Sequence, residues 1–295
     1  MASTQSRAVE RMYRTWTHER RNPPAEPEPR ETNDHWGDLT AEPRGVDYIE
    51  VPDGLWLAPK GAAAGGRVAL LCLHGGGFVS GSVFTHRKLY AHLAKAVGVP
   101  ALIAHQRYTP EHPYPAQQED ALAAYARLVS DGFDRIVLVG DSAGGGLAVT
   151  TTVAARGRSL PAPVALLLIS PWVDMTVSGD SFDTNADRDG FFYRDVVTGL
   201  AAMYLAGHDS RDPLVSPLFA DLTGLPPMFI QVGGDETLLD ESRMLEKRAR
   251  DFGVEVRRDV FEEQQHTFQM AAGRAPEADD AIGRFADWVR PKLEL

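Results

Sequence analysis

Residues 135–146 read Arg-Ile-Val-Leu-Val-Gly-Asp-Ser-Ala-Gly-Gly-Gly and lead from an apolar run, typical of a buried strand, into a helical pattern. The turn between them has the form Gly-x-Ser-x-Gly, with Ser142 at its centre. Glycines on both sides of the serine relieve crowding where the backbone turns sharply. A serine hydroxyl is a weak nucleophile unless a base removes its proton and its position is fixed. A strand–turn–helix elbow fixes that position, so we predict that Ser142 is a nucleophile rather than part of an ordinary glycine-rich turn.

A second glycine-rich turn lies upstream, where His74-Gly75-Gly76-Gly77-Phe78 follows the apolar run Val68–Leu73. Three successive glycines let backbone N–H groups converge on a developing oxyanion with no side chain in the way. A flexible turn and a phosphate-binding loop are the alternatives. The dinucleotide spacing Gly-x-Gly-x-x-Gly is absent from this turn, and no P-loop lysine follows the glycines. Because the same chain carries a serine elbow, an oxyanion hole is the better interpretation.

Two later turns offer the base and the acid that a serine nucleophile needs. His266 follows one predicted strand, and Asp235 and Glu236 follow another. The chain order serine, acid, histidine is that of α/β-hydrolases and differs from the order in chymotrypsin and subtilisin. We therefore predict His266 as the general base and one residue of the pair Asp235 and Glu236 as the acid.

The fold class follows from short apolar runs that alternate with helical patterns after about residue 47. We predict strands at Val68–Leu73, Ala101–Ala104, Arg135–Val139, Val164–Ile169, Met228–Val232 and Val254–Val260. Helices are predicted at Arg87–Ala96, Gln117–Ser130, Ala143–Ala155, Glu241–Phe252 and Asp279–Lys292, with a polar, basic helix at Ala8–Arg21 that ends before four prolines, Pro23, Pro24, Pro27 and Pro29. Near-continuous apolar strands separated by helices indicate an α/β fold with a mostly parallel sheet covered on both faces. Such sheets carry their active sites at the carboxyl ends of the strands.

The composition excludes several classes of protein. The 295 residues include 43% hydrophobic ones, enough for a large core, and carry a net charge of −11, which disfavours nucleic acid and anionic membranes as partners. No apolar run approaches the ~20 residues of a membrane helix, and the N-terminus lacks a secretory signal, so we expect a cytoplasmic protein without stable membrane insertion. The single cysteine, Cys72, cannot form an internal disulfide. No His-Glu-x-x-His motif is present, and we expect no metal and no cofactor.

The motifs resemble those of the bacterial hormone-sensitive-lipase-like esterases (HSL family), α/β-hydrolases that carry His-Gly-Gly-Gly and Gly-Asp-Ser-Ala-Gly. The resemblance covers roughly residues 34–291, and its further stretches are Tyr108–Ala116, Ser170–Asp174 and Asp212–Leu218. It implies an α/β-hydrolase fold with a helical cap over the site. We expect an N-terminal cap segment at residues 1–45, a catalytic domain at residues 46–295 and a cap insertion near residues 176–212.

The resemblance also favours one of the two candidate acids over the other. The commonest family pattern places a catalytic aspartate in Asp-Pro-Leu-x-Asp, whereas this chain reads Asp-Glu-Thr-Leu-Leu-Asp over residues 235–240. Alignment on Asp240 without a gap puts Glu236 at the catalytic position, and its spacing to His266 (266 − 236 = 30) also fits. Glu236 is the favoured acid and Asp235 is the alternative.

Other roles are carried by residues of the two glycine motifs. The resemblance implies an oxyanion hole at Gly75, Gly76, Gly77 and Ala143. The donors would be the N–H groups of Gly76, Gly77 and Ala143, while Gly75 shapes the loop and His74 holds it. Phe78 and Asp141 would bind the substrate, with aromatic residues of the cap lining the pocket.

The expected activity is hydrolysis of short- to medium-chain acyl esters through an acyl-enzyme, because a capped site suits small substrates. Lactone or amide hydrolysis needs the same groups and stays an alternative. A non-catalytic small-molecule receptor is the alternative from another class, since folds are reused for unrelated functions. The presence of serine, histidine and acid together favours the enzyme. A small-molecule ester is the expected partner, and a homodimer is compatible with the sequence.

Overall fold

The computed structural model describes residues 1–21, 35–62 and 67–295, and within them eight strands form one sheet in the order β1-β2-β4-β3-β5-β6-β7-β8. The first two strands, β1 (Val46–Val51) and β2 (Gly54–Pro59), pair antiparallel with each other, and β2 pairs antiparallel with β4. The other strands run parallel to their neighbours: β3 (Val68–Leu73), β4 (Ala101–Ala104), β5 (Arg135–Asp141), β6 (Ala165–Ile169), β7 (Met228–Gly233) and β8 (Val256–Phe261). The predicted α/β class and its mostly parallel sheet are confirmed.

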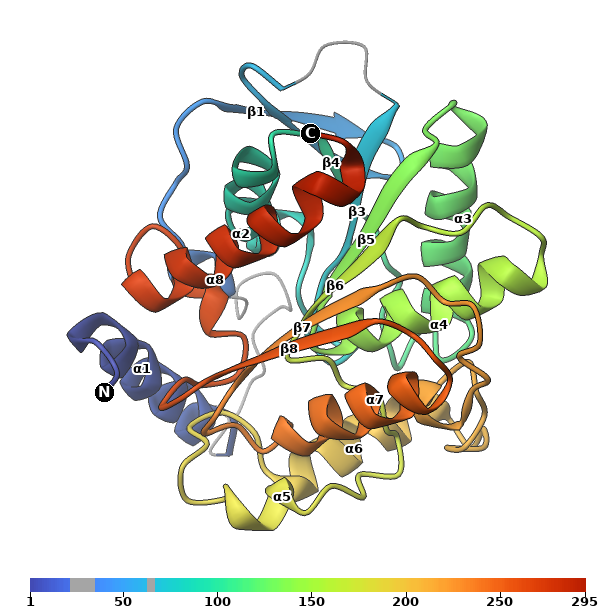
Figure 1. Cartoon of the computed structure of the whole chain (residues 1–295). Coiled ribbons are helices and arrows are strands. Elements are labelled where there is room, and N and C mark those ends of the chain that lie inside the picture. The colour runs from blue at the N-terminus through green and yellow to red at the C-terminus, as the bar shows by residue number, and fades with distance from the viewer. Residues whose placement is uncertain (22–34, 63–66) are drawn as a thin grey trace.

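Helices cover both faces of the sheet (Figure 1). One face carries α2 (Val83–Val97) and α8 (Pro276–Val289), which pack against each other. The opposite face carries α3 (Ala116–Ser130), α4 (Ala143–Gly157) and α7 (Leu239–Asp251). Helix α2 begins four residues before the predicted start because Ser82 caps it, with Ser82 Oγ accepting from the Thr85 N–H.

Three further helices gather near the lower end of the sheet in Figure 1: α1 (Thr4–Arg21), α5 (Ser181–Thr184) and α6 (Arg194–Leu205). The prediction for α1 began at Ala8, but Ser3 Oγ accepts from the Ser6 N–H and starts the helix earlier. The four prolines predicted to end this helix lie outside the described residues. The segment predicted as an insertion, residues 176–212, contains α5 and α6 between β6 and β7.

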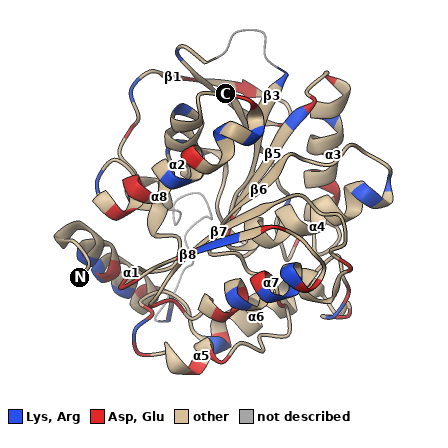
Figure 2. Ribbon diagram, viewed as in Figure 1, with Lys and Arg blue, Asp and Glu red and all other residues tan. Residues whose placement is uncertain are grey.

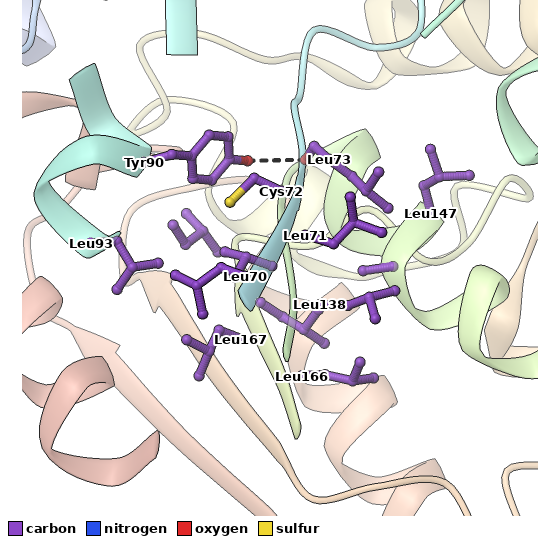
Figure 3. Close-up of a cluster of buried hydrophobic side chains, with 14 of the residues drawn as sticks. Leu70, Leu71, Cys72, Leu73, Tyr90, Leu93, Leu138, Leu147, Leu166 and Leu167 are labelled. Atoms are coloured by element: carbon purple, nitrogen blue, oxygen red, sulfur yellow. Dashed lines mark hydrogen bonds between the residues drawn. The ribbon is translucent and has the colours of Figure 1, made fainter. Parts of the chain in front are cut away.

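The core lies between the parallel strands and the helices on either face (Figure 3). Leu70, Leu71 and Leu73 of β3 are fully buried, and the Tyr90 hydroxyl of α2 lies 3.0 Å from the Leu73 carbonyl oxygen. Cys72 lies in the same cluster as a free, buried thiol whose pKa is raised by burial. The cysteine therefore acts as a small apolar side chain.

Charged residues lie mainly on the outer faces of the helices and in loops, as Figure 2 shows. Charged residues also lie on the two edge strands, with Asp47 and Glu50 on β1 and the basic residues Arg257 and Arg258 on β8. None of the helices in the described part of the chain is long and apolar enough to cross a bilayer.

Candidate active site

Ser142 occupies the sharp turn between β5 and α4, with φ 53° and ψ −122°. A non-glycine residue in this region costs about 1–3 kcal/mol and persists only where its surroundings impose it. Here they do: the Ser142 N–H donates to the Ile169 carbonyl at 2.9 Å, and its own carbonyl accepts from the Trp172 N–H at 2.9 Å. The flanking glycines are needed for close approach, because a Cβ added to Gly144 would lie 2.0 Å from the Leu73 carbonyl oxygen. The predicted strand–turn–helix elbow is present.

The second glycine motif forms a loop beside this elbow. Gly76 and Gly77 have φ 114° and 61°, in the left-handed region that favours glycine. In the described part of the chain, the N–H groups of these two glycines donate to no other protein group. Ala143 is the first residue of α4, so its N–H has no partner within the helix. The three N–H groups predicted as oxyanion donors therefore have no backbone acceptor within the described residues.

Gly75 and Asp141 meet beneath this loop. The Gly75 N–H donates to Asp141 Oδ1 at 3.0 Å, and a Cβ on Gly75 would lie 2.3 Å from Asp141 Oδ2. Tyr90 donates to the same Oδ1 at 2.6 Å, and His86 Nε2 lies 3.4 Å from Oδ2. Burial opposes ionisation, yet these partners hold the pKa of Asp141 below its usual value. The expected substrate contact of Asp141 has no support in this geometry, because the buried carboxylate is engaged by the loop and by α2.

His74 also supports the loop. Its ring is buried and its Nδ1 donates to the Gly75 carbonyl at 2.8 Å, so the proton of the neutral ring sits on Nδ1. Burial, together with His86 beside it, lowers the pKa of His74 to about 4. The ring therefore stays neutral at pH 7 and can keep this hydrogen bond.

His266 and Glu236 form a buried pair after β8 and β7. His266 Nδ1 lies 2.6 Å from Glu236 Oε2, and both side chains are 0% exposed. Among the described residues, His266 Nε2 is buried without a hydrogen-bond partner. One ring nitrogen is thus held by a carboxylate, and the other is left to accept a proton.

The alternative acid, Asp235, lies elsewhere. Its side chain is 21% exposed and its Oδ1 is 3.3 Å from Arg188 Nη1. Burial raises the pKa of Asp235, with smaller contributions from nearby acidic residues. Of the two candidates, the geometry brings Glu236 to the imidazole and turns Asp235 toward an arginine.

Aromatic rings surround the histidine. The ring of Phe192 meets His266 edge-on at 4.8 Å between centroids, and Phe191 packs 4.8 Å from Tyr13 of α1. Thr17 of α1 donates to the Gly190 carbonyl at 2.9 Å. Helix α1 and the segment before α6 therefore meet beside His266.

Phe78 directly follows the three glycines of the loop. It is buried and stacks on Tyr204 of α6, with 4.0 Å between ring centroids. Leu200, also on α6, reaches the loop, since a Cβ on Gly77 would lie 2.9 Å from one of its methyl groups. These side chains make an apolar wall next to the free N–H groups.

Two contributors were not assigned a role from the sequence. Ser170 Oγ donates to Glu236 Oε1 at 2.8 Å and accepts from the Thr267 N–H at 3.2 Å. Asp189 accepts from Thr237. Ser170 stands in a stretch that the family resemblance had marked, so its position, though not its role, had a sequence signal.

Comparison with known proteins identifies the family to which the chain belongs. A family model described as the alpha/beta hydrolase fold matches residues 70–270. An acetyl-hydrolase of Streptomyces hygroscopicus is 41% identical over 249 residues, which cover 84% of this chain and 82% of that protein. An esterase of Acinetobacter venetianus is 32% identical over 231 residues, covering 77% of this chain and 76% of that protein. A crystal structure of an esterase from the bacterial hormone-sensitive lipase family has a TM-score of 0.91 and 38% identity, with 99% of both chains covered. This chain belongs to the α/β-hydrolase fold family, as an esterase of the bacterial hormone-sensitive-lipase-like group.

Proposed function

We propose that the chain is a serine carboxylesterase that hydrolyses short- to medium-chain acyl esters with Ser142, His266 and Glu236 as its triad. The observation that carries this proposal is the hydrogen bonding of the two ring nitrogens of His266. Its Nδ1 is held by Glu236 at 2.6 Å while its buried Nε2 has no protein partner among the described residues. A triad histidine needs that arrangement to accept the serine proton on the free nitrogen.

In the first half of the reaction, Ser142 Oγ attacks the ester carbonyl carbon and its proton passes to His266 Nε2. The carbonyl oxygen becomes an oxyanion and accepts from the N–H groups of Gly76, Gly77 and Ala143. The carbon–oxygen bond to the alcohol then breaks, and the leaving alkoxide takes the proton from His266. The acyl group remains on Ser142.

Water completes the cycle. His266 removes a proton from water, which attacks the acyl carbon and forms a second oxyanion in the same hole. Its collapse expels Ser142, which regains the proton, and releases the carboxylic acid. Throughout, Glu236 keeps the Nδ1 proton of His266 in place and stabilises the imidazolium.

The cap belongs to the same proposal. Helix α1 and residues 176–212 would cover the site, which their contacts around Phe191 and the stacking of Phe78 on Tyr204 support. Leu200, close to Gly77, leaves little room beside the oxyanion loop. The similarity to a Streptomyces acetyl-hydrolase is in keeping with a preference for small acyl groups.

The test is a series of p-nitrophenyl esters from acetate to laurate, combined with a fluorophosphonate label located by mass spectrometry. Ser142→Ala should lower kcat by roughly 10⁶, the loss seen where a serine triad is fully engaged. Ser130→Ala, at an exposed serine that ends α3, is the control and should behave as wild type. Labelling at a serine other than Ser142, or strong activity in Ser142→Ala, would contradict the assignment.

A further inference from the structure

We propose that Asp189 is a positioning residue that joins the aromatic wall of the site to the loop of the triad acid, so that acyl selectivity and turnover depend on one side chain. This inference rests on the proposed function. Asp189 lies in the loop that joins α5 to α6 and is 0% exposed.

Each oxygen of the Asp189 carboxylate accepts two hydrogen bonds. Oδ1 accepts from the N–H groups of Phe191 and Phe192, at 2.7 and 3.0 Å. Oδ2 accepts from the N–H and the hydroxyl of Thr237, at 2.6 and 2.9 Å. A carboxylate is costly to bury unless its oxygens accept several donors, so these four bonds fix its place.

Through its two oxygens, Asp189 is linked to two groups that contact the same imidazole, that of His266. Phe192, held through Oδ1, packs edge-on against the His266 ring. Thr237, held through Oδ2, follows Glu236, whose carboxylate engages His266 Nδ1. A shift of Asp189 would therefore move both the ring that walls the site and the acid that orients the base.

Neighbouring residues of the same segment extend the connection. Asn185 Nδ2 donates to the Glu236 carbonyl at 2.8 Å, and the Gly190 N–H donates to Gln265 Oε1 at 2.7 Å. Thr17 of α1 donates to the Gly190 carbonyl on the outer side. The segment thus contacts the acid loop, the base loop and α1, with Asp189 at its centre.

Asp189→Asn tests this role without changing the size of the side chain. An amide has only one acceptor oxygen. Its NH2 group would face either the N–H groups of Phe191 and Phe192 or the N–H and hydroxyl of Thr237. One pair of buried donors then loses its acceptor, and the corresponding loop must shift. Misplacement of catalytic groups by about 1 Å can cost on the order of 100-fold in rate.

The experiment measures kcat and KM for p-nitrophenyl acetate, butyrate and octanoate, with each rate divided by the number of Ser142 sites that a fluorophosphonate labels. We expect kcat per labelled site to fall ~10- to 100-fold in Asp189→Asn and the acetate-to-octanoate ratio of kcat/KM to change. A purely structural role would reduce the labelled fraction but would leave both values per site unchanged. That last outcome overturns the inference.

Asp174→Asn is the matched control. Asp174 is equally buried and also accepts four hydrogen bonds, but all of them come from Thr176 and Ser178 within one turn. This variant should lose thermal stability and keep the acyl selectivity of the wild type. An equal change of selectivity in both variants would assign the effect to general loosening and would also overturn the inference.

Two smaller changes keep the inference testable if Asp189→Asn does not fold. Thr237→Val removes only the hydroxyl donor on the acid side and should lower kcat several-fold with selectivity kept. Phe192→Leu alters only the wall and should change selectivity more than kcat for acetate. Wild-type behaviour of both variants would overturn the inference. Failure of the proposed function itself would give a different result. In that case the fluorophosphonate would not label Ser142 of the wild-type protein.

Discussion

Ser170 Oγ donates a hydrogen bond of 2.8 Å to Oε1 of Glu236, the carboxylate oxygen that does not face His266. The Gly233 N–H donates to the same oxygen at 2.5 Å. With Oε1 occupied twice, the carboxylate cannot rotate without breaking these bonds, and Oε2 stays directed at the imidazole. Ser170 is therefore placed to set the orientation of the acid.

Ser170→Ala should lower kcat roughly tenfold with little change in KM, since a hydrogen bond to a charged group contributes about 1.5–3 kcal/mol. Ser216→Ala is the matched control, because Ser216 is also fully buried and also donates to one group and accepts from a backbone N–H. Both variants are compared by active-site titration and p-nitrophenyl acetate turnover. Equal kcat in the two would show that Ser170 does not act through Glu236.

Glu236→Gln should reduce kcat on the order of 10⁴-fold, because an amide cannot stabilise the imidazolium and can favour the wrong tautomer of His266. Asp235→Asn should change kcat only slightly, since Asp235 contacts Arg188 at the edge of the site. Steady-state kinetics on one ester checks both. The reverse ranking would transfer the role to Asp235.

Tyr90→Phe should lower kcat roughly tenfold through the oxyanion loop. The change removes the hydroxyl that donates to Asp141 Oδ1, the acceptor of the Gly75 N–H. Tyr125→Phe is the control, since Tyr125 is also buried and donates to a backbone carbonyl, that of Pro161, on the outer side of α3. The prediction is wrong if the two variants turn over acetate equally fast.

The start of α1 should detach from α8 at acid pH. Glu277 accepts from the Ser3 N–H at 2.6 Å and from the hydroxyls of Ser3 and Ser6, and these bonds outweigh burial and lower its pKa. A lowered folded-state pKa means that the stabilisation is fully present above the ordinary value of 4.5 and is lost as pH falls below it.

Thermal unfolding from pH 7 to pH 3 tests this link. Glu277→Gln should have the lower Tm at pH 7, and the difference from wild type should shrink toward pH 3. Hydrogen exchange at pH 7 should show faster exchange in α1 of the variant. A Tm difference that stays constant over this range would contradict the role of the carboxylate charge.

The sequence predicted the parallel strands well because most of them are short, nearly continuous apolar runs, as in Leu70–Leu73. It did not predict β1 and β2. Strand β1 lies at the edge of the sheet, where only Val46 is buried and Ile49 is 52% exposed, and its sequence carries no apolar run. Its pairing with β2 becomes visible only in the structure.

The residues of the candidate site also fall into those that the sequence predicted and those that it did not. Ser142, Gly76 and His266 stand in local motifs whose spacing indicates their chemistry. Asp189 and Ser170 act on partners 48 and 66 residues further along the chain, and single aspartates or serines in loops have no pattern of their own. Asp141 lies in a motif, but the sequence could not reveal that α2 would supply its partner, Tyr90.

The complete burial of the His266–Glu236 pair has a spectroscopic consequence. Both side chains are 0% exposed, so the proton between Nδ1 and Oε2 is shielded from bulk water and should exchange with it slowly. Such a proton should give a resolved far-downfield signal in the proton NMR spectrum of the resting enzyme. The signal would report directly on the alignment of acid and base, even in variants that no longer turn over substrate.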